Sequence, residues 1–264
     1  MISALQAVAN LVRRETGIEV GPPQFAALQA AIARVEPGMT PERLLAAAGS
    51  EALVQRLINE VSIRETFFLR HRGELEAIDW HRSLAAANRR GSGVVRVWVA
   101  GCASGEEAYT LAILACEAFA CSTPPVQVLA TDIATAALEQ AERCSYASRS
   151  VSTVSDDLRR RYFTARDGLL CVDDRLRRLV EFRRQNLVRD LPPGGAAKAF
   201  DVISCRNVLI YFDRALQDRA VGLFAGSLCR RGFLGLGARE TLQFTAHAGS
   251  FREPAWREKW YQRC

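Results

Sequence analysis

Three acidic side chains beside a glycine turn are the residues of this chain best suited to binding a ligand. Residues 100–105 read Ala-Gly-Cys-Ala-Ser-Gly, and Glu106 and Glu107 follow directly. A third acid, Asp132, closes the next apolar segment. A turn of small residues between a strand and a helix lets a nucleotide-like ligand lie against bare backbone. The pattern therefore predicts a nucleotide-type site at Gly101, Glu107 and Asp132.

The spacing of the glycines excludes two common nucleotide sites. Gly101 and Gly105 give neither G-x-G-x-x-G nor G-x-x-x-x-G-K-[ST]. What remains is the S-adenosylmethionine turn, in which an acid after the second strand takes the ribose hydroxyls. Purely structural interpretations stay open. The glycines could form an ordinary turn, Asp132 could cap the next helix, and Glu106 could simply stabilise a helix N-terminus through the helix dipole.

Further motifs are more specific, and their order resembles that of CheR-type chemoreceptor methyltransferases, S-adenosylmethionine-dependent enzymes that methylate receptor glutamates. The resembling segments are Glu65-Thr66-Phe67-Phe68-x-Arg70, Ala100-x5-Glu106-Glu107-Ala108-Tyr109, Ala130-Thr131-Asp132-Ile133, Asn186-Leu187 and Cys205-Arg206-Asn207-Val208-Leu209-Ile210-Tyr211-Phe212. The likeness covers almost the whole chain. It implies a protein-glutamate O-methyltransferase that forms glutamyl methyl esters on chemoreceptors during signalling adaptation.

The resemblance also implies a set of site residues. The expected cofactor-binding residues are Arg64, Thr66, Arg70, Ala100, Gly101, Glu107, Asp132, Ile133, Asn186, Leu187, Arg206 and Asn207. Ala100 and Glu107 would face the methionine half of the cofactor, and Asp132 would bind its ribose. Asn186 and Leu187 would bracket its adenine. The expected catalytic residues are Arg70 and Tyr211, and the product would be S-adenosylhomocysteine.

The chemistry of this reaction fits the residues. A glutamate carboxylate is already ionised near neutral pH, so no general base is needed. The enzyme has to align a carboxylate oxygen, the methyl carbon and the sulfonium in line. Arg70 could hold the carboxylate and Tyr211 could orient it, although Arg70 could instead form a structural ion pair. We expect no catalytic histidine.

Five features depart from the family pattern, and one of them is Ala108 in place of the usual proline after Glu106 and Glu107. Arg64 stands where the family usually has asparagine, and Leu69 where it has phenylalanine. Gly237-Ala238-Arg239-Glu240 replaces the usual Gly-His-Ser-Glu. The inserted region shows no obvious long glycine-centred hairpin, which leaves open whether it tethers a receptor tail.

The elements that must position these residues follow from hydrophobic periodicity. Hydrophobic periodicity predicts helices over residues 1–58. The resemblance implies that these helices form an N-terminal domain, that residues 59–72 are a linker contributing to the cofactor site, and that residues 73–264 form a methyltransferase domain. A small β-subdomain is expected as an insert at about 145–178. In the resembling family, the helical domain and the insert serve receptor recognition.

The expected fold class is α/β, with a Rossmann-like S-adenosylmethionine-dependent methyltransferase domain. Residues 94–100, 126–132 and 199–205 predict buried strands that alternate with helices, as in a mostly parallel sheet with crossovers. Residues 73–87 predict one helix. The last strand, at residues 260–263, is expected to be antiparallel and to lie at the sheet edge.

Composition and charge limit the classes of site and partner that we expect for this chain. The chain has 264 residues, 49% of them hydrophobic, a net charge of +6, and no apolar run long enough to span a membrane. Its eight cysteines form no C-x-x-C pair, so we expect a cytoplasmic protein without a metal site. Residues 158–189 hold ten arginines against four acids, a net charge of +6 that suggests an acidic partner.

The expected partner is the glutamate-bearing cytoplasmic helical domain of a chemoreceptor. Nucleic acid is not expected, because the basic segment lacks interleaved aromatic residues. We expect a monomer without direct membrane insertion. A non-catalytic S-adenosylmethionine-binding regulatory module is the alternative function, and a methylase of small molecules is a third. Neither the receptor nor its glutamates can be read from the sequence.

Overall fold

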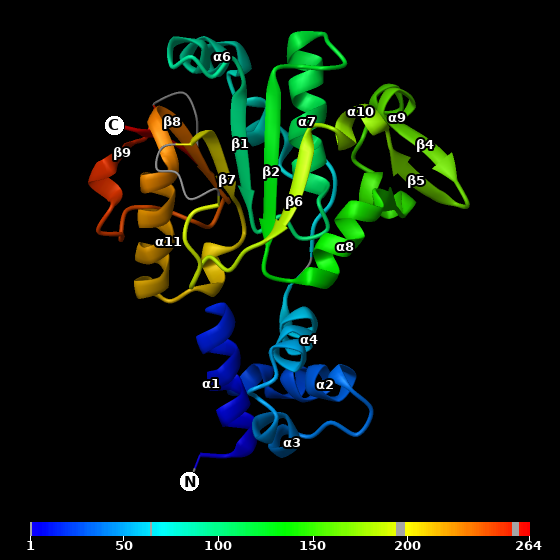
Figure 1. The fold of residues 1–264 in the computed structure, drawn as a ribbon, viewed down its shortest axis with the longest axis vertical. Coiled ribbons are helices and arrows are strands. Elements are labelled where there is room, and N and C mark those ends of the chain that lie inside the picture. The colour runs from blue at the N-terminus through cyan, green and yellow to red at the C-terminus, as the bar shows by residue number, and fades with distance from the viewer. Residues whose placement is uncertain (1, 64, 194–198, 255–258) are drawn as a thin grey trace.

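A seven-stranded sheet forms the centre of the computed structural model, which describes residues 2–63, 65–193, 199–254 and 259–264 (Figure 1). The strand order is β6-β2-β1-β7-β8-β10-β9. The strands are β1 (Val95–Ala100), β2 (Val126–Asp132), β6 (Val180–Arg184), β7 (Phe200–Cys205), β8 (Leu228–Leu236), β9 (Phe251–Arg252) and β10 (Trp260–Arg263). Neighbouring strands from β6 to β8 run parallel, and β10 is antiparallel to both of its neighbours.

The predicted Rossmann-like fold with an antiparallel last strand is confirmed. The predicted edge position of that strand is wrong, because β9 lies outside it.

The two faces of the sheet carry separate apolar cores. Val97 and Val99 of β1 belong to one core, and Trp98 and Ala100 belong to the other. This division follows from the two-residue period of a strand. All six residues of β7 are buried, as expected of a parallel strand that is covered on both faces.

Helices cover both faces of the sheet. They are α5 (Arg72–Glu76), α6 (Trp80–Arg89), α7 (Glu106–Phe119), α8 (Thr135–Arg143), α10 (Asp174–Arg177), α11 (Arg214–Ser227) and the short 3-10 helices η3 (Leu209–Tyr211) and η4 (Ala248–Ser250). The single helix predicted over residues 73–87 is in fact two helices. Asp79 separates them, because its carboxylate accepts a hydrogen bond from the Arg82 amide and so caps the second helix. No helix within the described residues is long and apolar enough to cross a membrane.

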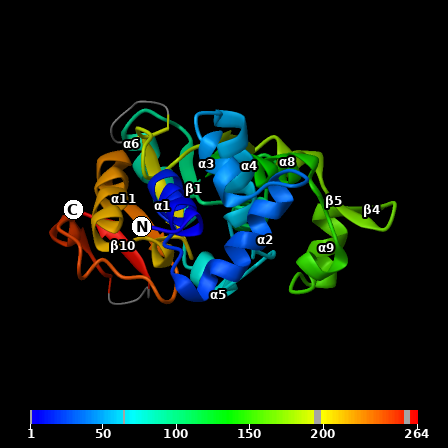
Figure 2. The same ribbon diagram turned by 90° about the horizontal axis from the view of Figure 1, so that it is seen from below.

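The first sixty residues form a helical unit below the carboxyl ends of the parallel strands (Figures 1 and 2). Its helices are α1 (Ala4–Thr16), η1 (Pro22–Gln24), α2 (Phe25–Val35), α3 (Pro41–Ala46) and α4 (Glu51–Val61). These helices share a core of their own, which includes Val8, Ile32 and Leu57. Thr40 caps α3, and Pro41 is the first helical residue, as the sequence predicts. The domain boundaries at residues 58 and 72 stay a prediction.

A second, three-stranded sheet projects to one side of the main sheet (Figure 2). It consists of β3 (Ser145–Tyr146), β4 (Phe163–Arg166) and β5 (Leu169–Val172), with η2 (Ser148–Val151) and α9 (Asp156–Tyr162) beside it. β4 and β5 pair with Arg166 opposite Leu169, so two residues make the turn. Asp167 and Gly168 both have positive φ, 48° and 76°, as this kind of hairpin turn requires. The insert therefore contains a short glycine-centred hairpin.

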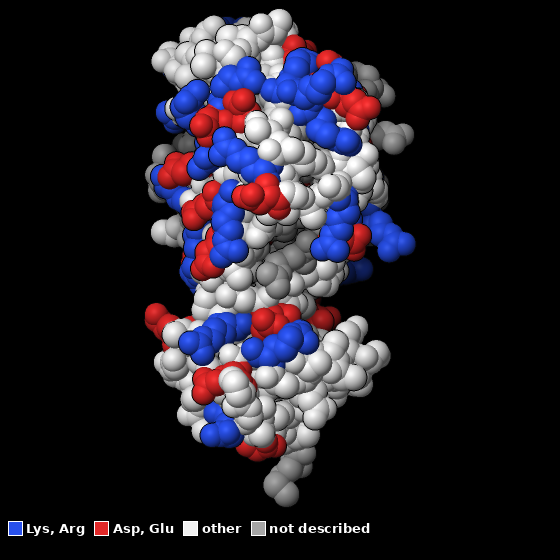
Figure 3. Space-filling model, turned by 90° about the vertical axis from the view of Figure 1, so that its right-hand side faces the viewer, with Lys and Arg blue, Asp and Glu red and all other residues white. Residues whose placement is uncertain are grey.

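The arginines of residues 158–189 are mostly paired. Their ion pairs are Arg159–Asp156, Arg160–Asp157, Arg161–Glu117, Arg175–Asp173, Arg177–Asp174, Arg183–Glu181 and Arg189–Glu15. Several of the acids come from outside the segment, which is why the sequence count overstates its charge. Figure 3 shows acidic and basic side chains interleaved over this side of the molecule.

Candidate functional site

A pocket at the carboxyl ends of the parallel strands gathers most of the predicted site residues. Those that line it are Thr66, Arg70, Gly101, Glu107, Asp132, Ile133, Asn186, Leu187, Arg206, Asn207 and Tyr211. Of the remaining two, Ala100 does not line the pocket but is buried within β1. Arg64 lies outside the described residues. Segments far apart in the sequence thus meet at one site, because parallel strands end at the same edge of the sheet.

The turn after β1 has an unusual backbone conformation, and it brings the main chain to the wall of the pocket. Gly101, Ala103 and Gly105 have positive φ of 81°, 47° and 90°. A Cβ on Gly101 would lie 2.4 Å from a methyl group of Val208, so no larger residue fits there without a shift. The turn therefore exposes backbone to the pocket beside the loop after β7.

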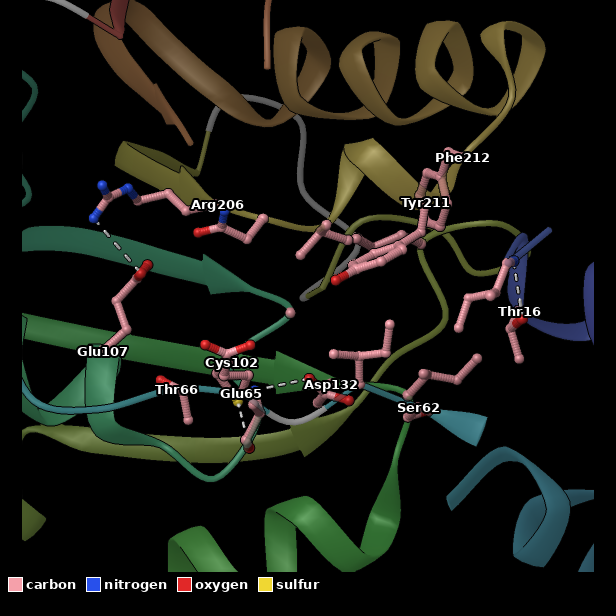
Figure 4. Close-up of a pocket in the computed structure, with 18 of the residues that line it drawn as sticks. Thr16, Ser62, Glu65, Thr66, Cys102, Glu107, Asp132, Arg206, Tyr211 and Phe212 are labelled. Atoms are coloured by element: carbon pink, nitrogen blue, oxygen red, sulfur yellow. Dashed lines mark hydrogen bonds and ion pairs between the residues drawn. The ribbon is translucent and has the colours of Figure 1, made fainter. Parts of the chain in front are cut away.

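Asp132 is held by the turn that it faces. Its two carboxylate oxygens accept hydrogen bonds from the amides of Ala103 (2.8 Å) and Ala134 (2.9 Å). The N-cap of α8 is Ala134, so Asp132 does not cap that helix in the usual way. The amide bonds fix the orientation of an acceptor-only group at the pocket wall (Figure 4).

Glu107 and Arg206 point toward one another at one end of the pocket, opposite the end where Thr16 lies (Figure 4). Their charged groups are 3.9 Å apart, and the Ser204 hydroxyl donates a 2.7 Å hydrogen bond to Glu107. Burial raises the pKa of the Glu107 carboxyl above its usual value, although Arg206 and Ser204 oppose that shift. The Arg206 side chain is 3% exposed and also pairs with Glu74. This end of the pocket therefore holds a buried arginine beside a partly buried acid.

Glu106 faces away from the pocket and ties the turn to the insert. Its carboxylate accepts hydrogen bonds from the hydroxyls of Ser104 (2.7 Å) and Ser150 (2.8 Å). The Tyr146 hydroxyl also donates to the Ser104 carbonyl, at 2.8 Å. The two adjacent acids therefore differ: one is structural, and Glu107 lines the pocket.

Arg70 lies on a strained and firmly anchored segment. The residues before and after it, Leu69 and His71, have positive φ of 56° and 53°, which is uncommon outside glycine. Its guanidinium donates a 2.6 Å hydrogen bond to the Glu65 carbonyl and lies 5.8 Å from the centre of the Phe67 ring. The anchor is Phe68, which is fully buried. No carboxylate side chain pairs with Arg70 among the described residues, so the guanidinium is available to an anion.

Tyr211 lies close to Arg70 in the same pocket. Burial raises the pKa of its phenol, and the negative charges of Glu65 and Glu240 add to the shift, whereas Arg70 opposes it. The hydroxyl therefore stays protonated at neutral pH and can donate a hydrogen bond. Figure 4 shows the ring reaching into the pocket from the loop after β7.

Asn207 is positioned by the carboxylate of Glu240, the last residue of the segment in which Ala238 and Arg239 depart from the family pattern. Glu240 accepts hydrogen bonds from the backbone amides of Asn207, Val208, Leu209, Ile210 and Gly237. Asn207 itself has a positive φ of 60°. Glu240 thus fixes the loop that carries Asn207 and Tyr211, and the changed residues Ala238 and Arg239 do not remove it.

Asn186 joins the pocket to the helical unit. Its amide donates a 2.7 Å hydrogen bond to the Glu15 carbonyl, and its carbonyl accepts one from the Val188 amide at 2.9 Å. The Asn186 side chain therefore also stabilises the turn that follows it. Leu187, beside it, is buried and offers an apolar surface.

The sequence missed ten residues that line the pocket. They are Thr16, Ile18, Ser62, Ile63, Glu65, Cys102, Ala103, Gln185, Val208 and Phe212. Most neighbour a predicted residue, so adjacency alone could have found them. Thr16 and Ile18 had no such signal, because Thr16 ends α1 and Ile18 follows the Gly17 cap of that helix.

The pocket fits the groups of S-adenosylmethionine. Ile18, Ile133 and Leu187 provide apolar surface for a base, and the Asp132 carboxylate provides acceptors for a ribose diol. Glu107 supplies a negative charge that matches the amino group of the methionine half, and Arg70 leaves a positive charge for the carboxylate of a substrate. The lining therefore suits an adenosine joined to an amino acid.

Comparison with known proteins agrees with this chemistry. The family model described as "CheR methyltransferase, SAM binding domain" matches residues 64–255. A Pseudomonas putida protein named Cher3 is 39% identical over 165 residues, which cover 60% of this chain and 58% of that protein. A chemotaxis protein methyltransferase of Listeria monocytogenes is 33% identical over 197 residues, 75% of this chain and 72% of the relative. An uncharacterized 104.1 kDa protein of Rhodobacter capsulatus is 37% identical over 150 residues, only 15% of its length. The matched region thus spans less than two thirds of two of these relatives.

Proposed function

Since this chain belongs to the CheR methyltransferase family and contains its S-adenosylmethionine-binding domain, we propose that it methylates glutamate side chains of chemoreceptors. One observation carries the proposal furthest. The pocket combines an anion-binding guanidinium, Arg70, and a phenol, Tyr211, with no histidine among its described lining residues. A site without a histidine base suits a nucleophile that is already ionised.

The reaction needs no proton transfer within the protein. S-adenosylmethionine supplies an electrophilic methyl group on a positively charged sulfur. A glutamate carboxylate oxygen forms a bond to that methyl carbon while the carbon–sulfur bond breaks, and the bonding pair stays on sulfur. The products are a glutamyl methyl ester and neutral S-adenosylhomocysteine, so charge and atoms balance. The protein contributes positioning.

Each lining residue takes a role that follows from its chemistry. Arg70 holds the substrate carboxylate, and Tyr211 donates a hydrogen bond that orients it. Asp132 binds the ribose hydroxyls, and Glu107 binds the ammonium group of the cofactor. Ile133, Asn186 and Leu187 enclose the adenine, and Gly101, Thr66, Arg206 and Asn207 complete the wall.

The proposed partner is the glutamate-bearing helical domain of a chemoreceptor in the cytoplasm. Ile63 supports a protein substrate, because it lines the pocket and is 55% exposed. An exposed apolar side chain at the rim of a charged pocket suits contact with a helix surface. The helical unit and the insert are the proposed recognition surfaces, and the protein is proposed to act as a monomer.

A labelled-methyl assay tests the function. The purified chain is incubated with radiolabelled S-adenosylmethionine and receptor cytoplasmic fragments from the same genome, and base-labile label is counted. We expect label on glutamate in the wild type and loss of turnover by about 100-fold or more in Arg70→Ala, while S-adenosylhomocysteine still binds. Arg72→Ala is the matched control, because Arg72 is an exposed arginine paired with Glu76 outside the pocket.

Other outcomes of the assay would exclude the proposal. Cofactor binding without label on any receptor fragment would identify a regulatory S-adenosylmethionine-binding module instead. Label on a free metabolite but not on protein would identify a small-molecule methylase. Equal turnover in Arg70→Ala and Arg72→Ala would remove Arg70 from the mechanism.

A further inference from the structure

We propose that a cleft lined by arginines, at the opposite end of the sheet from the cofactor pocket, binds a small compound carrying two or more phosphate groups. The cleft lies between α6 and β8, at the end of the molecule away from α1 and α4 (Figure 1). Its volume is about 310 Å³. The proposal does not depend on methyl transfer.

Five arginines line the cleft: Arg82, Arg89, Arg90, Arg230 and Arg231. Arg82 and Arg89 are seven residues apart on α6, which places them on one face of the helix two turns apart. Arg90 follows as the C-cap residue of the same helix. The helix α6 and its C-cap therefore supply three of the five arginines.

An irregularity in β8 supplies the other two. The ladder between β7 and β8 passes from Phe200 opposite Leu228 to Val202 opposite Phe233, so the residues between them leave the regular pairing. Arg231 has a positive φ of 66°, which is uncommon for a residue with a side chain. The backbone thus departs from the ladder where Arg230 and Arg231 lie, and both are exposed.

The cleft has little negative charge to balance these groups. Asp201 is the one acid among its described lining residues, so five arginines face one aspartate, a net charge of +4. Both Asp201 oxygens are already engaged, one with the Arg90 guanidinium and the other with the Arg96 amide. The Asp201 side chain is 5% exposed, so it offers no acceptor to the other arginines.

The arginines of the cleft differ from those of residues 158–189 in how many of them pair with an acid. Most arginines of residues 158–189 pair with an acid. Within the described residues, no acid pairs with Arg82, Arg89, Arg230 or Arg231. Clustered like charges repel one another and destabilise a fold, and a bound anion relieves that repulsion.

Phosphate groups match the number and kind of donors. A guanidinium fork binds phosphate bidentately, and each phosphate group offers three acceptor oxygens and up to about two negative charges. Two phosphate groups would therefore balance a net charge of +4, whereas a single carboxylate would not. The small volume of the cleft favours a compound over a protein segment.

Calorimetry on the full chain, saturated with S-adenosylhomocysteine, tests this site. The probes are inorganic pyrophosphate and ATP without magnesium, because the saturated cofactor pocket cannot then take the adenosine. We expect binding that weakens by about 10-fold or more in the double variant Arg89→Ala/Arg230→Ala. The control is Arg160→Ala/Arg177→Ala, which removes the same charge from two ion-paired arginines on the insert. Melting temperature and S-adenosylhomocysteine affinity verify that both variants fold.

Three outcomes would overturn the proposal. The first is an equal loss of pyrophosphate affinity in both double variants, which would mean non-specific attraction. The second is no binding of either probe by the wild type. The third is binding to vesicles rich in phosphatidylglycerol without binding to pyrophosphate, which would indicate a membrane surface rather than a small phosphate compound.

Discussion

At the scale of single residues, two acids of the same pocket differ in how well hydrogen bonds and charges stabilise their carboxylates. Asp132 accepts two backbone amide hydrogen bonds that hold its carboxylate. Glu107 has one hydroxyl donor and an arginine at 3.9 Å, and burial raises its pKa. A buried carboxylate with incomplete compensation costs stability, and such costs concentrate at functional sites.

Glu107→Gln is predicted to stabilise the protein at alkaline pH and not at acid pH. Because the pKa of Glu107 is raised in the folded state, its protonation favours folding below the unfolded pKa of about 4.3, and that stability is lost as the pH rises through the folded pKa. Glutamine mimics the protonated acid at every pH. The melting temperature of Glu107→Gln should therefore exceed that of the wild type at pH near 8 and match it at pH near 4.

The control and a second measurement make this prediction specific. Glu139→Gln removes an exposed acid and should leave the difference between the two pH values unchanged. Glu107→Gln should also weaken S-adenosylhomocysteine binding, because the proposed ammonium partner is lost. A lower melting temperature of Glu107→Gln at alkaline pH would show that Arg206 outweighs burial.

At the scale of elements, the loop from Asn207 to Tyr211 depends on one distant carboxylate. Four consecutive amides at the start of η3 and the Gly237 amide all donate to Glu240. Amides at a helix start have no partners within the helix, so a buried carboxylate there satisfies several at once. The loop is thus held by a residue about thirty positions later in the chain.

Glu240→Gln is predicted to lower the free energy of unfolding by about 2 kcal/mol or more. The amide keeps one acceptor oxygen but brings a donor against amides that also donate, and the negative charge is lost. Urea denaturation measures the change. Glu253→Gln, an exposed acid, should change stability by less than about 0.5 kcal/mol. Equal effects of the two substitutions would contradict the role of Glu240.

At the scale of the whole molecule, the helical unit forms part of the pocket. Thr16 and Ile18 line it directly. Gln55 of α4 donates a 2.9 Å hydrogen bond to the carbonyl of the lining residue Ile133, and Glu15 accepts one from Asn186. Docking of the helices is therefore coupled to the shape of the cofactor site.

Gln55→Ala is predicted to weaken S-adenosylhomocysteine binding by about 5-fold, the equivalent of one hydrogen bond of about 1 kcal/mol. Gln55 does not line the pocket, so we expect the effect to pass through its contact with Ile133. Calorimetry measures the affinity. Gln29→Ala, on the exposed face of α2, should leave it unchanged. Unchanged affinity in Gln55→Ala would show that this contact does not support the pocket.

Sequence reasoning reached the sheet and most of the site because both follow local rules. The strand at residues 95–100, the glycine turn and Asp132 carry the period and residue types that such elements need. Parallel strands end at one edge, so the approximate meeting of Arg70, Asp132 and Tyr211 could be predicted. The β-subdomain of the insert could be predicted as well, whereas the Asp167–Gly168 turn gives only a weak sequence signal because its strands are four residues long.

What the sequence alone determined is the family pattern, the mostly parallel sheet and the residue types of a pocket for S-adenosylmethionine. Only the tertiary structure decided that Thr16 and Ile18 line the pocket and that Glu240 holds the loop. It also separated the paired arginines of the insert from the unpaired ones beside α6. The physical reason is that hydrogen bonds and ion pairs join residues far apart in the chain, whereas propensity and periodicity report only on neighbours.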